Sequence, residues 1–204
     1  MATTLDILRR ETRALVFDQC GNAVDGAEEQ LTYRIDTTPD GGATYDADVL
    51  LELTIKTIDR LAEASVQVLA QVAAVGVTSF WHSLLGVDRD GTPCTPVYYW
   101  ADTRSAQDAF ALREELDAHA IWQRTGCRLH PSYWPAKLRW LQRSEPAMVE
   151  RVAQWISFPE YALGRLCEPA AAAVTLCMAS GTGMLDVHSL QWDHELLQLF
   201  GLEP

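Results

Sequence analysis

"TTLDILRRETRALVFDQCGN", residues 3–22, opens the chain with two short apolar segments separated by three charged residues. Val, Ile, Thr and Leu dominate both segments, and β-branched residues are enriched in strands. A third segment of this kind, residues 29–37, follows a link that carries Gly21 and Asn22. Strands joined by such short links run antiparallel to their neighbours. The first forty residues therefore predict three antiparallel strands, with Arg9-Arg10-Glu11 as the first turn.

A helix and a fourth strand are predicted next. Asp46 stands where its side chain can cap a helix over residues 47–72, whose leucines recur at helical spacing. Residues 73–80, "AAVGVTSF", have the length and composition of a buried parallel strand. This order of elements predicts an α/β fold with a mixed central sheet, three antiparallel strands and then parallel ones, flanked by helices.

The bulk composition excludes several classes of function. The chain has 204 residues, 48% of them hydrophobic, and a net charge of -12. It has two lysines and scattered arginines, which argues against a nucleic-acid surface because such a surface needs clustered positive charge. No apolar run reaches the roughly 20 residues that span a bilayer, and no signal-peptide pattern is present. We expect a cytoplasmic protein with neither a nucleic-acid nor a membrane partner.

Generic metal and catalytic motifs are absent from the sequence. The five cysteines are odd in number, far apart and form no C-x-x-C pair, which argues against a disulfide framework or a zinc site. There is no G-x-x-x-x-G-K-[ST] loop, no G-x-S-x-G elbow and no H-E-x-x-H. We assign no metal-binding residue.

Two polar clusters are candidates for a binding site. His82 follows the predicted parallel strand, and ligands of open α/β sheets bind at that end of a strand; a structural role explains His82 equally well. Asp102 and Arg104 lie two residues apart beside Trp100. They predict either a structural ion pair or a pair of groups that hydrogen-bond opposite ends of a polyol or sugar acid.

Four blocks of sequence carry a family resemblance. They are "GVTSFWHSLLGVDRDGTPCTPVYYWADTRS" (76–105), "TG" with "YWPAKLRWL" (125–141), "FPEYALGRL" (158–166), and "ASGTGMLD" with "WD" (179–193). In this order they resemble the N-terminal half of FGGY-family carbohydrate kinases, with gluconate kinases as the most similar members. The resemblance implies an actin-like, ribonuclease-H-type α/β fold and one sugar-binding domain over residues 1–204.

The same resemblance implies an activity and a set of residues. The family uses ATP and magnesium to phosphorylate a hydroxyl of a sugar or sugar acid. Asp6 matches the acidic residue near the magnesium ion and the phosphates. Tyr133 is a weaker match than the other sugar-pocket residues, because Trp134 after it stands where the family usually has a small residue. The sugar-pocket residues that the resemblance implies are Trp81, His82, Asp102, Arg104 and Tyr133.

Two departures from the family argue against catalysis by this chain alone. Where the family has a Gly-Thr-Ser/Thr turn that contacts phosphate, residues 8–11 read Leu-Arg-Arg-Glu. A turn without glycine cannot approach a phosphate closely, and Glu11 would repel it, although Arg9 or Arg10 could supply compensating charge. Family members also have a second domain that brings most of the ATP site and the catalytic base. We expect both beyond Pro204, so no catalytic residue is assigned.

Two alternatives remain open. The chain could be a degenerate kinase module that binds a sugar acid or a partner subunit without catalysis, which residues 8–11 favour. A ribonuclease-H-like nuclease would need clustered carboxylates, and Asp6, Asp18 and Asp102 are loosely compatible with one, but the acidic charge argues against it. Half of a kinase should expose apolar surface, so we also expect self-association or a second chain near the C-terminal helix.

Overall fold

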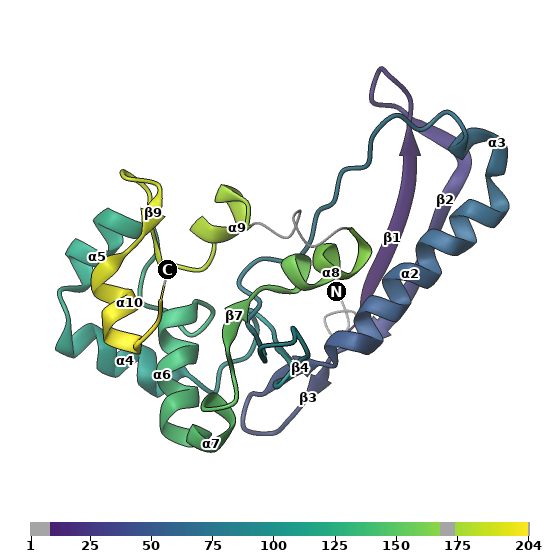
Figure 1. The fold of residues 1–204 in the computed structure, drawn as a ribbon. Helices are drawn as coiled ribbons and strands as arrows, with labels where there is room; N and C mark the ends of the chain where they lie inside the picture. The colour runs from purple at the N-terminus through teal and green to yellow at the C-terminus, as the bar shows by residue number, and fades with distance from the viewer. Residues whose placement is uncertain (1–8, 168–173, 204) are drawn as a thin grey trace, which may run out of the picture. The chain divides into compact units, whose positions relative to one another are not determined.

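The computed structural model describes residues 9–167 and 174–203 (Figure 1). Asp6 lies outside the described residues. The chain divides into two compact units, the first made of residues 9–35 and 46–78 and the second of residues 36–45 and 79–203. Each unit contains both helices and strands, as the sequence predicts.

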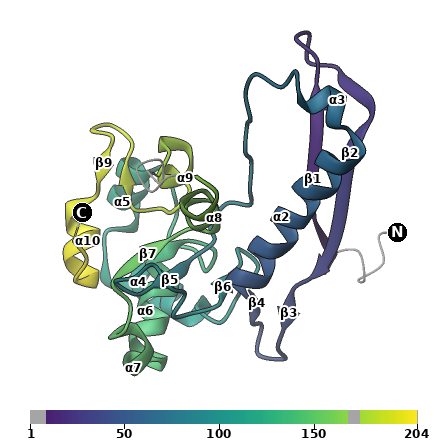
Figure 2. The same cartoon turned by 45° about the vertical axis from the view of Figure 1, so that its right-hand side comes forward.

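The first unit is a long β-hairpin with a helix packed on it (Figures 1 and 2). The two strands pair antiparallel, from Arg9 opposite Arg34 to Phe17 opposite Ala23. The Asp18 carboxylate closes the turn between them, because its Oδ1 accepts the N–H groups of Cys20 and Asn22, each at 2.8 Å. The elements of this unit are β1 (Arg9–Phe17), β2 (Ala23–Arg34), α2 (Ala47–Ala64) and α3 (Val66–Leu69).

Helix α2 begins where the sequence predicts. The Asp46 carboxylate accepts the N–H of Val49 at 3.0 Å, which satisfies one of the free donors at the helix N-terminus. The helix ends earlier than predicted, at Ala64, and a short second helix, α3, follows Ser65. Thr57 of α2 and Thr12 of β1 share a hydrogen bond of 2.5 Å between their hydroxyl groups, which joins the helix to the hairpin.

The predicted turn at Arg9-Arg10-Glu11 is wrong. These residues belong to β1 and pair with residues 32–34 of β2. The physical reason is that Arg and Glu carry none of the turn-forming properties of Gly, Asn, Asp or Pro, so nothing in this stretch reverses the chain. The first reversal among the described residues comes at residues 18–22, where Gly21 takes a φ of +81°.

The predicted parallel strand over residues 73–80 is also wrong. This segment has no strand structure, and Val75 is 83% exposed. An apolar run forms a strand only where another strand pairs with its backbone, and none of the described strands pairs with this segment. Every strand pair among the described residues is antiparallel, so the strand pairing gives no support to the predicted parallel strands.

The second unit has short strands and a helical core. Its sheets have the strand orders β3-β4-β6, β5-β7 and β8-β9. Its elements are β3 (Asp36–Thr37), β4 (Ala43–Tyr45), β5 (Leu85–Val87), β6 (Val97–Tyr98), α4 (Ala106–Glu115), α5 (Ala118–Thr125), α6 (Trp134–Ser144), α7 (Pro146–Val149), β7 (Gln154–Ile156), α8 (Phe158–Leu166), α9 (Leu176–Ser180), β8 (Leu185–Asp186), β9 (Gln191–Trp192) and α10 (His194–Phe200).

Helix α6 supplies much of the core of the second unit. Leu138 and Leu141 are 1% and 0% exposed, and Leu112 of α4 packs in the same cluster. Leu196, Leu197 and Phe200 of α10 are buried in this cluster too. The C-terminal helix therefore directs most of its apolar side chains inward, and Leu199 is its exposed one. Self-association through this helix stays a prediction.

Among the described residues, none of the helices combines the length and the apolar character that a crossing of the bilayer requires.

Candidate functional site

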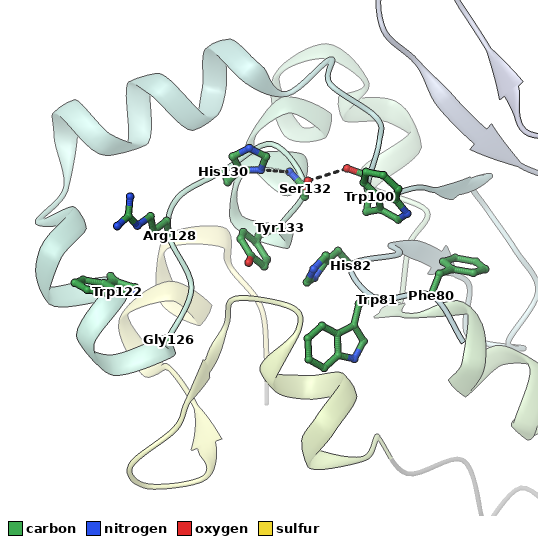
Figure 3. Close-up of a pocket in the computed structure, with 10 residues that line it drawn as sticks. All are labelled: Phe80, Trp81, His82, Trp100, Trp122, Gly126, Arg128, His130, Ser132 and Tyr133. Carbon is green, nitrogen blue, oxygen red and sulfur yellow. Dashed lines mark hydrogen bonds between the residues drawn. The ribbon is translucent and has the colours of Figure 1, made fainter. Parts of the chain in front are cut away.

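An open cleft of about 700 Å³ lies in the second unit and is rich in aromatic side chains (Figure 3). Trp81, Trp100 and Trp122 are each more than 40% exposed, although tryptophan is usually largely buried. Exposed aromatic rings around a hollow are typical of a ligand site, because they offer apolar faces to a bound molecule. The lining residues are Phe80, Trp81, His82, Trp100, Trp122, Gly126, Arg128, His130, Ser132 and Tyr133.

His82 is held firmly at this cleft. Its backbone takes a φ of +62°, a left-handed conformation that is uncommon for a residue other than glycine. Its Nδ1 donates a hydrogen bond to the carbonyl oxygen of Gly181, and its ring meets the ring of Tyr133 edge-on at 4.6 Å between centroids. Burial lowers the pKa of His82 and outweighs the opposing hydrogen bond to Gly181. The imidazole is thus neutral at pH 7, with Nε2 as a hydrogen-bond acceptor.

The loop before α6 brings His130, Ser132 and Tyr133 to the cleft (Figure 3). The Ser132 hydroxyl donates to the carbonyl oxygen of Trp100 at 2.8 Å, and the Ser132 N–H donates to His130 Nδ1 at 3.2 Å. Lys137, 1% exposed, reaches this loop from α6 and donates from Nζ to the carbonyl oxygens of Pro131 and Ser132. Lys137 therefore holds the backbone that presents the lining residues.

The protonation of Lys137 should make stability depend on pH. Burial lowers the pKa of Lys137 from 10.5 to about 7, against the opposing charge of Asp102. Between these two pH values the unfolded chain keeps the proton and the folded chain loses it, so the free energy of unfolding rises with pH. From pH 7 to pH 9 we expect the free energy of unfolding of wild type to rise by about 2 kcal/mol relative to that of Lys137→Met.

Urea denaturation of both proteins at pH 7, 8 and 9 measures this difference. Every other titrating group is common to the two proteins, so its contribution cancels. A difference that stays constant across this range would show that Lys137 does not lose its proton in the folded state.

Asp102 and Arg104 form a buried ion pair outside the lining of the cleft. Asp102 is 2% exposed. Its Oδ1 accepts from the N–H and Nε of Arg104 at 3.2 and 3.1 Å, and its Oδ2 accepts from Nη2 of Arg104 at 2.6 Å and from the N–H of Ala43 at 3.0 Å. The Arg104 guanidinium also lies over the ring of Trp140, 4.5 Å from its centroid. This geometry agrees with the structural ion pair, one of the two roles that the sequence allowed for these residues.

The structure thus brings together part of the predicted site. Trp81, His82 and Tyr133 line one cleft, whereas Asp102 and Arg104 are not among its lining residues. A sugar contact by this ion pair stays a prediction. Trp100 comes directly before the "ADTRS" motif, so its position in the sequence was a reason to expect it near the site.

Other lining residues were missed by sequence reasoning. Trp122 and Arg128 belong to the segment from α5 to the following loop and carry no recognisable motif. Among the described residues there is no group of three or more His, Cys, Asp or Glu side chains that could hold a metal ion.

Comparisons with known proteins agree on one family. The family model for the FGGY family of carbohydrate kinases, N-terminal domain, matches residues 1–204. Gluconokinase from Bacillus subtilis is 27% identical over 200 residues, which are 98% of this chain and 38% of that protein. Glycerol kinase from Alcanivorax borkumensis is 29% identical over 94% of this chain and 39% of its own length. The chain thus spans well under half of these curated relatives.

The solved structures give the same result for the fold. The crystal structure of gluconate kinase from Lactobacillus acidophilus matches with a TM-score of 0.85 and 27% identity, over 95% of this chain and 38% of that one. Xylulose kinase from Rhodospirillum rubrum matches with a TM-score of 0.87 at 22% identity, over 95% of this chain and 40% of that one. These likenesses confirm the predicted actin-like, ribonuclease-H-type α/β fold. The chain belongs to the FGGY family of carbohydrate kinases and has the sequence of their N-terminal domain.

Proposed function

We propose that the chain is the sugar-binding part of a carbohydrate kinase that acts on gluconate or a closely related sugar acid. The observation that carries this proposal is the likeness to gluconate kinases over nearly the whole chain, both in sequence and in fold. The aromatic cleft supports it. Ring faces pack against the C–H groups of a sugar, and polar side chains between them select its hydroxyl groups.

Within the cleft we assign the sugar contacts to Trp81, His82 and Tyr133. Trp81 offers an exposed ring, and His82 offers Nε2 as an acceptor for a hydroxyl group. The rings of Tyr133 and His82 meet edge to face, which limits the rotation of both side chains. A prearranged site of this kind loses less side-chain entropy when a ligand binds.

We further propose that the 204 residues do not transfer a phosphoryl group by themselves. The family implies ATP and a divalent metal ion, but residues 8–11 contain no glycine that would let the backbone approach a phosphate. Residues 9–11 also lie in an extended strand, which cannot wrap a phosphate as a loop does. Phosphoryl transfer requires both reactants to be positioned together. We place the ATP site and the catalytic base in the part of the relatives that this chain does not span.

Calorimetry with the purified chain tests the sugar site. Titration with gluconate, xylulose and glycerol should show heat of binding for gluconate, while an enzyme-coupled assay for ADP with gluconate and ATP should show no turnover. Absence of binding to all three compounds would overturn the proposed sugar site. ATP-dependent phosphorylation of gluconate by this chain would overturn the proposal that it is inactive alone.

A degenerate module that binds a partner subunit is the second candidate, and the Leu-Arg-Arg-Glu sequence at residues 8–11 favours it. A sugar kinase domain whose second part is supplied separately should gain activity when that part is added, and a degenerate module should not. Mixing the chain with the C-terminal part of Bacillus subtilis gluconokinase, followed by the same assay, distinguishes the two.

A further inference from the structure

Arg128 differs from the other side chains around the cleft in its charge. Of the ten described residues that line the cleft, it is the one with a permanent positive charge. The histidines add none at pH 7, because burial lowers the pKa of His82 and of His130, and the charges of Arg113 and Lys137 lower that of His130 further. The cleft therefore presents aromatic faces, neutral polar groups and a single guanidinium.

The Arg128 guanidinium has no carboxylate partner within the described part of the chain. It lies over the ring of Trp122, 5.4 Å from the ring centroid, at the opposite end of the cleft from Phe80 (Figure 3). Arg124 gives a contrast in the same segment, because it pairs with Asp193 at 2.7 Å and with Glu195 at 2.8 Å. Arg128 is also exposed, so its donors are open to a bound anion.

We propose that Arg128 recognises the carboxylate of a sugar acid and thereby selects aldonates over neutral sugars. This inference rests on the sugar-binding function proposed above. A guanidinium is planar and binds a carboxylate through two parallel hydrogen bonds, which a point charge cannot reproduce. The cation–π contact with Trp122 limits the positions of the guanidinium, so fewer conformations are lost when the carboxylate arrives.

A local cation at the cleft offsets the acidic charge of the whole protein. The chain has a net charge of -12, whose field disfavours the approach of an anion. At physiological ionic strength, charges more than about 8 Å apart are largely screened. A cation at the cleft can therefore outweigh the distant acidic residues, and the sugar chain would extend from Arg128 past Tyr133 and His82.

Calorimetry of the full chain with two matched ligands tests this role. Gluconate and glucitol are both six-carbon polyols, and glucitol has a CH₂OH group in place of the carboxylate. Wild type should bind gluconate more tightly. Arg128→Gln should weaken gluconate binding about tenfold or more, the usual range for a hydrogen bond to a charged group, and leave glucitol binding within about twofold. Arg128→Lys should retain part of the preference, because it keeps the charge and loses the planar fork.

Arg89→Gln is the control variant. Arg89 is exposed in the turn between β5 and β6 and is not a lining residue of the cleft. Its substitution removes the same charge, so gluconate binding should not change. Because Arg128 is exposed as well, neither variant should alter the circular dichroism spectrum or the unfolding midpoint.

The outcomes separate this inference from the proposed function. If wild type binds gluconate and glucitol equally well, or if Arg128→Gln weakens both alike or neither, the sugar site stands and the carboxylate role of Arg128 is wrong. If wild type binds neither ligand, the proposed function itself is overturned, and the inference with it.

Discussion

Replacement of Asp102 by alanine is expected to destabilise the protein by about 3–5 kcal/mol, the usual effect of removing one partner of a buried ion pair. The side chain of Asp102 is 3% exposed, and the side chain of its partner Arg104 is 21% exposed. Without Asp102, Arg104 would remain partly desolvated and would lose its hydrogen-bonded counter-charge, leaving the weaker interaction with Asp40. The N–H of Ala43 in β4 would lose its acceptor at the same time, which loosens the link between β4 and the loop before α4.

Urea denaturation monitored by tryptophan fluorescence measures this loss. Glu115→Ala is the matched control, because Glu115 and Arg139 form an exposed bidentate pair. Exposed pairs contribute about 0–1 kcal/mol. Equal losses in the two variants would contradict the role of Asp102 as a buried structural partner. A loss of sugar binding in Asp102→Ala would not by itself identify a sugar contact, since unfolding would produce the same result.

Replacement of Trp134 by alanine is expected to cost a similar amount, about 3–5 kcal/mol, because it removes the largest type of side chain from a core. Trp134 is 6% exposed. Its Nε1 donates to the carbonyl oxygen of Ser83 at 2.9 Å, and its backbone N–H donates to Thr182 at 3.0 Å. The residue therefore joins α6 to two other segments that bear on the cleft, those after His82 and after Gly181.

Trp134→Phe separates packing from hydrogen bonding. Phenylalanine keeps most of the apolar contact and leaves the buried Ser83 carbonyl without this donor, so we expect a loss of about 1–3 kcal/mol. The free energy of unfolding of both variants is measured in urea at pH 7. If Trp134→Ala were no less stable than Trp134→Phe, the ring would not be an essential part of the core.

The sequence predicts those parts of the fold that depend on local chemistry. The Asp46 cap and the turn at residues 18–22 follow from side chains that bond to the nearby backbone. Whether residues 73–80 form a strand depends instead on a partner strand, and a single sequence does not show which distant segments pair. The turn predicted at residues 9–11 failed for a local reason, because that stretch has no turn-forming residue and pairs with β2.

The same distinction applies to the site. Trp81, His82 and Tyr133 lie in recognisable motifs, and the structure brings all three to one cleft. The Asp102–Arg104 pair fitted two roles equally well from its sequence. Its burial and the bond to Ala43, which only the folded chain reveals, agree with the structural role, and the sugar contact stays a prediction. Trp122 and Arg128 reach the cleft through the packing of α5, so no local pattern marked them.

A two-dimensional ¹H–¹⁵N nuclear magnetic resonance titration of the full chain with gluconate, observing the indole N–H signals, tests whether the aromatic cleft binds a sugar acid. The chain has seven tryptophans, and three of them line the cleft: Trp81, Trp100 and Trp122. The proposed sugar site predicts that the signals of these three shift, while those of Trp134, Trp140, Trp155 and Trp192 stay in place. No shift at saturating gluconate, or shifts confined to the second group, would contradict the assignment of this cleft as the sugar-acid site.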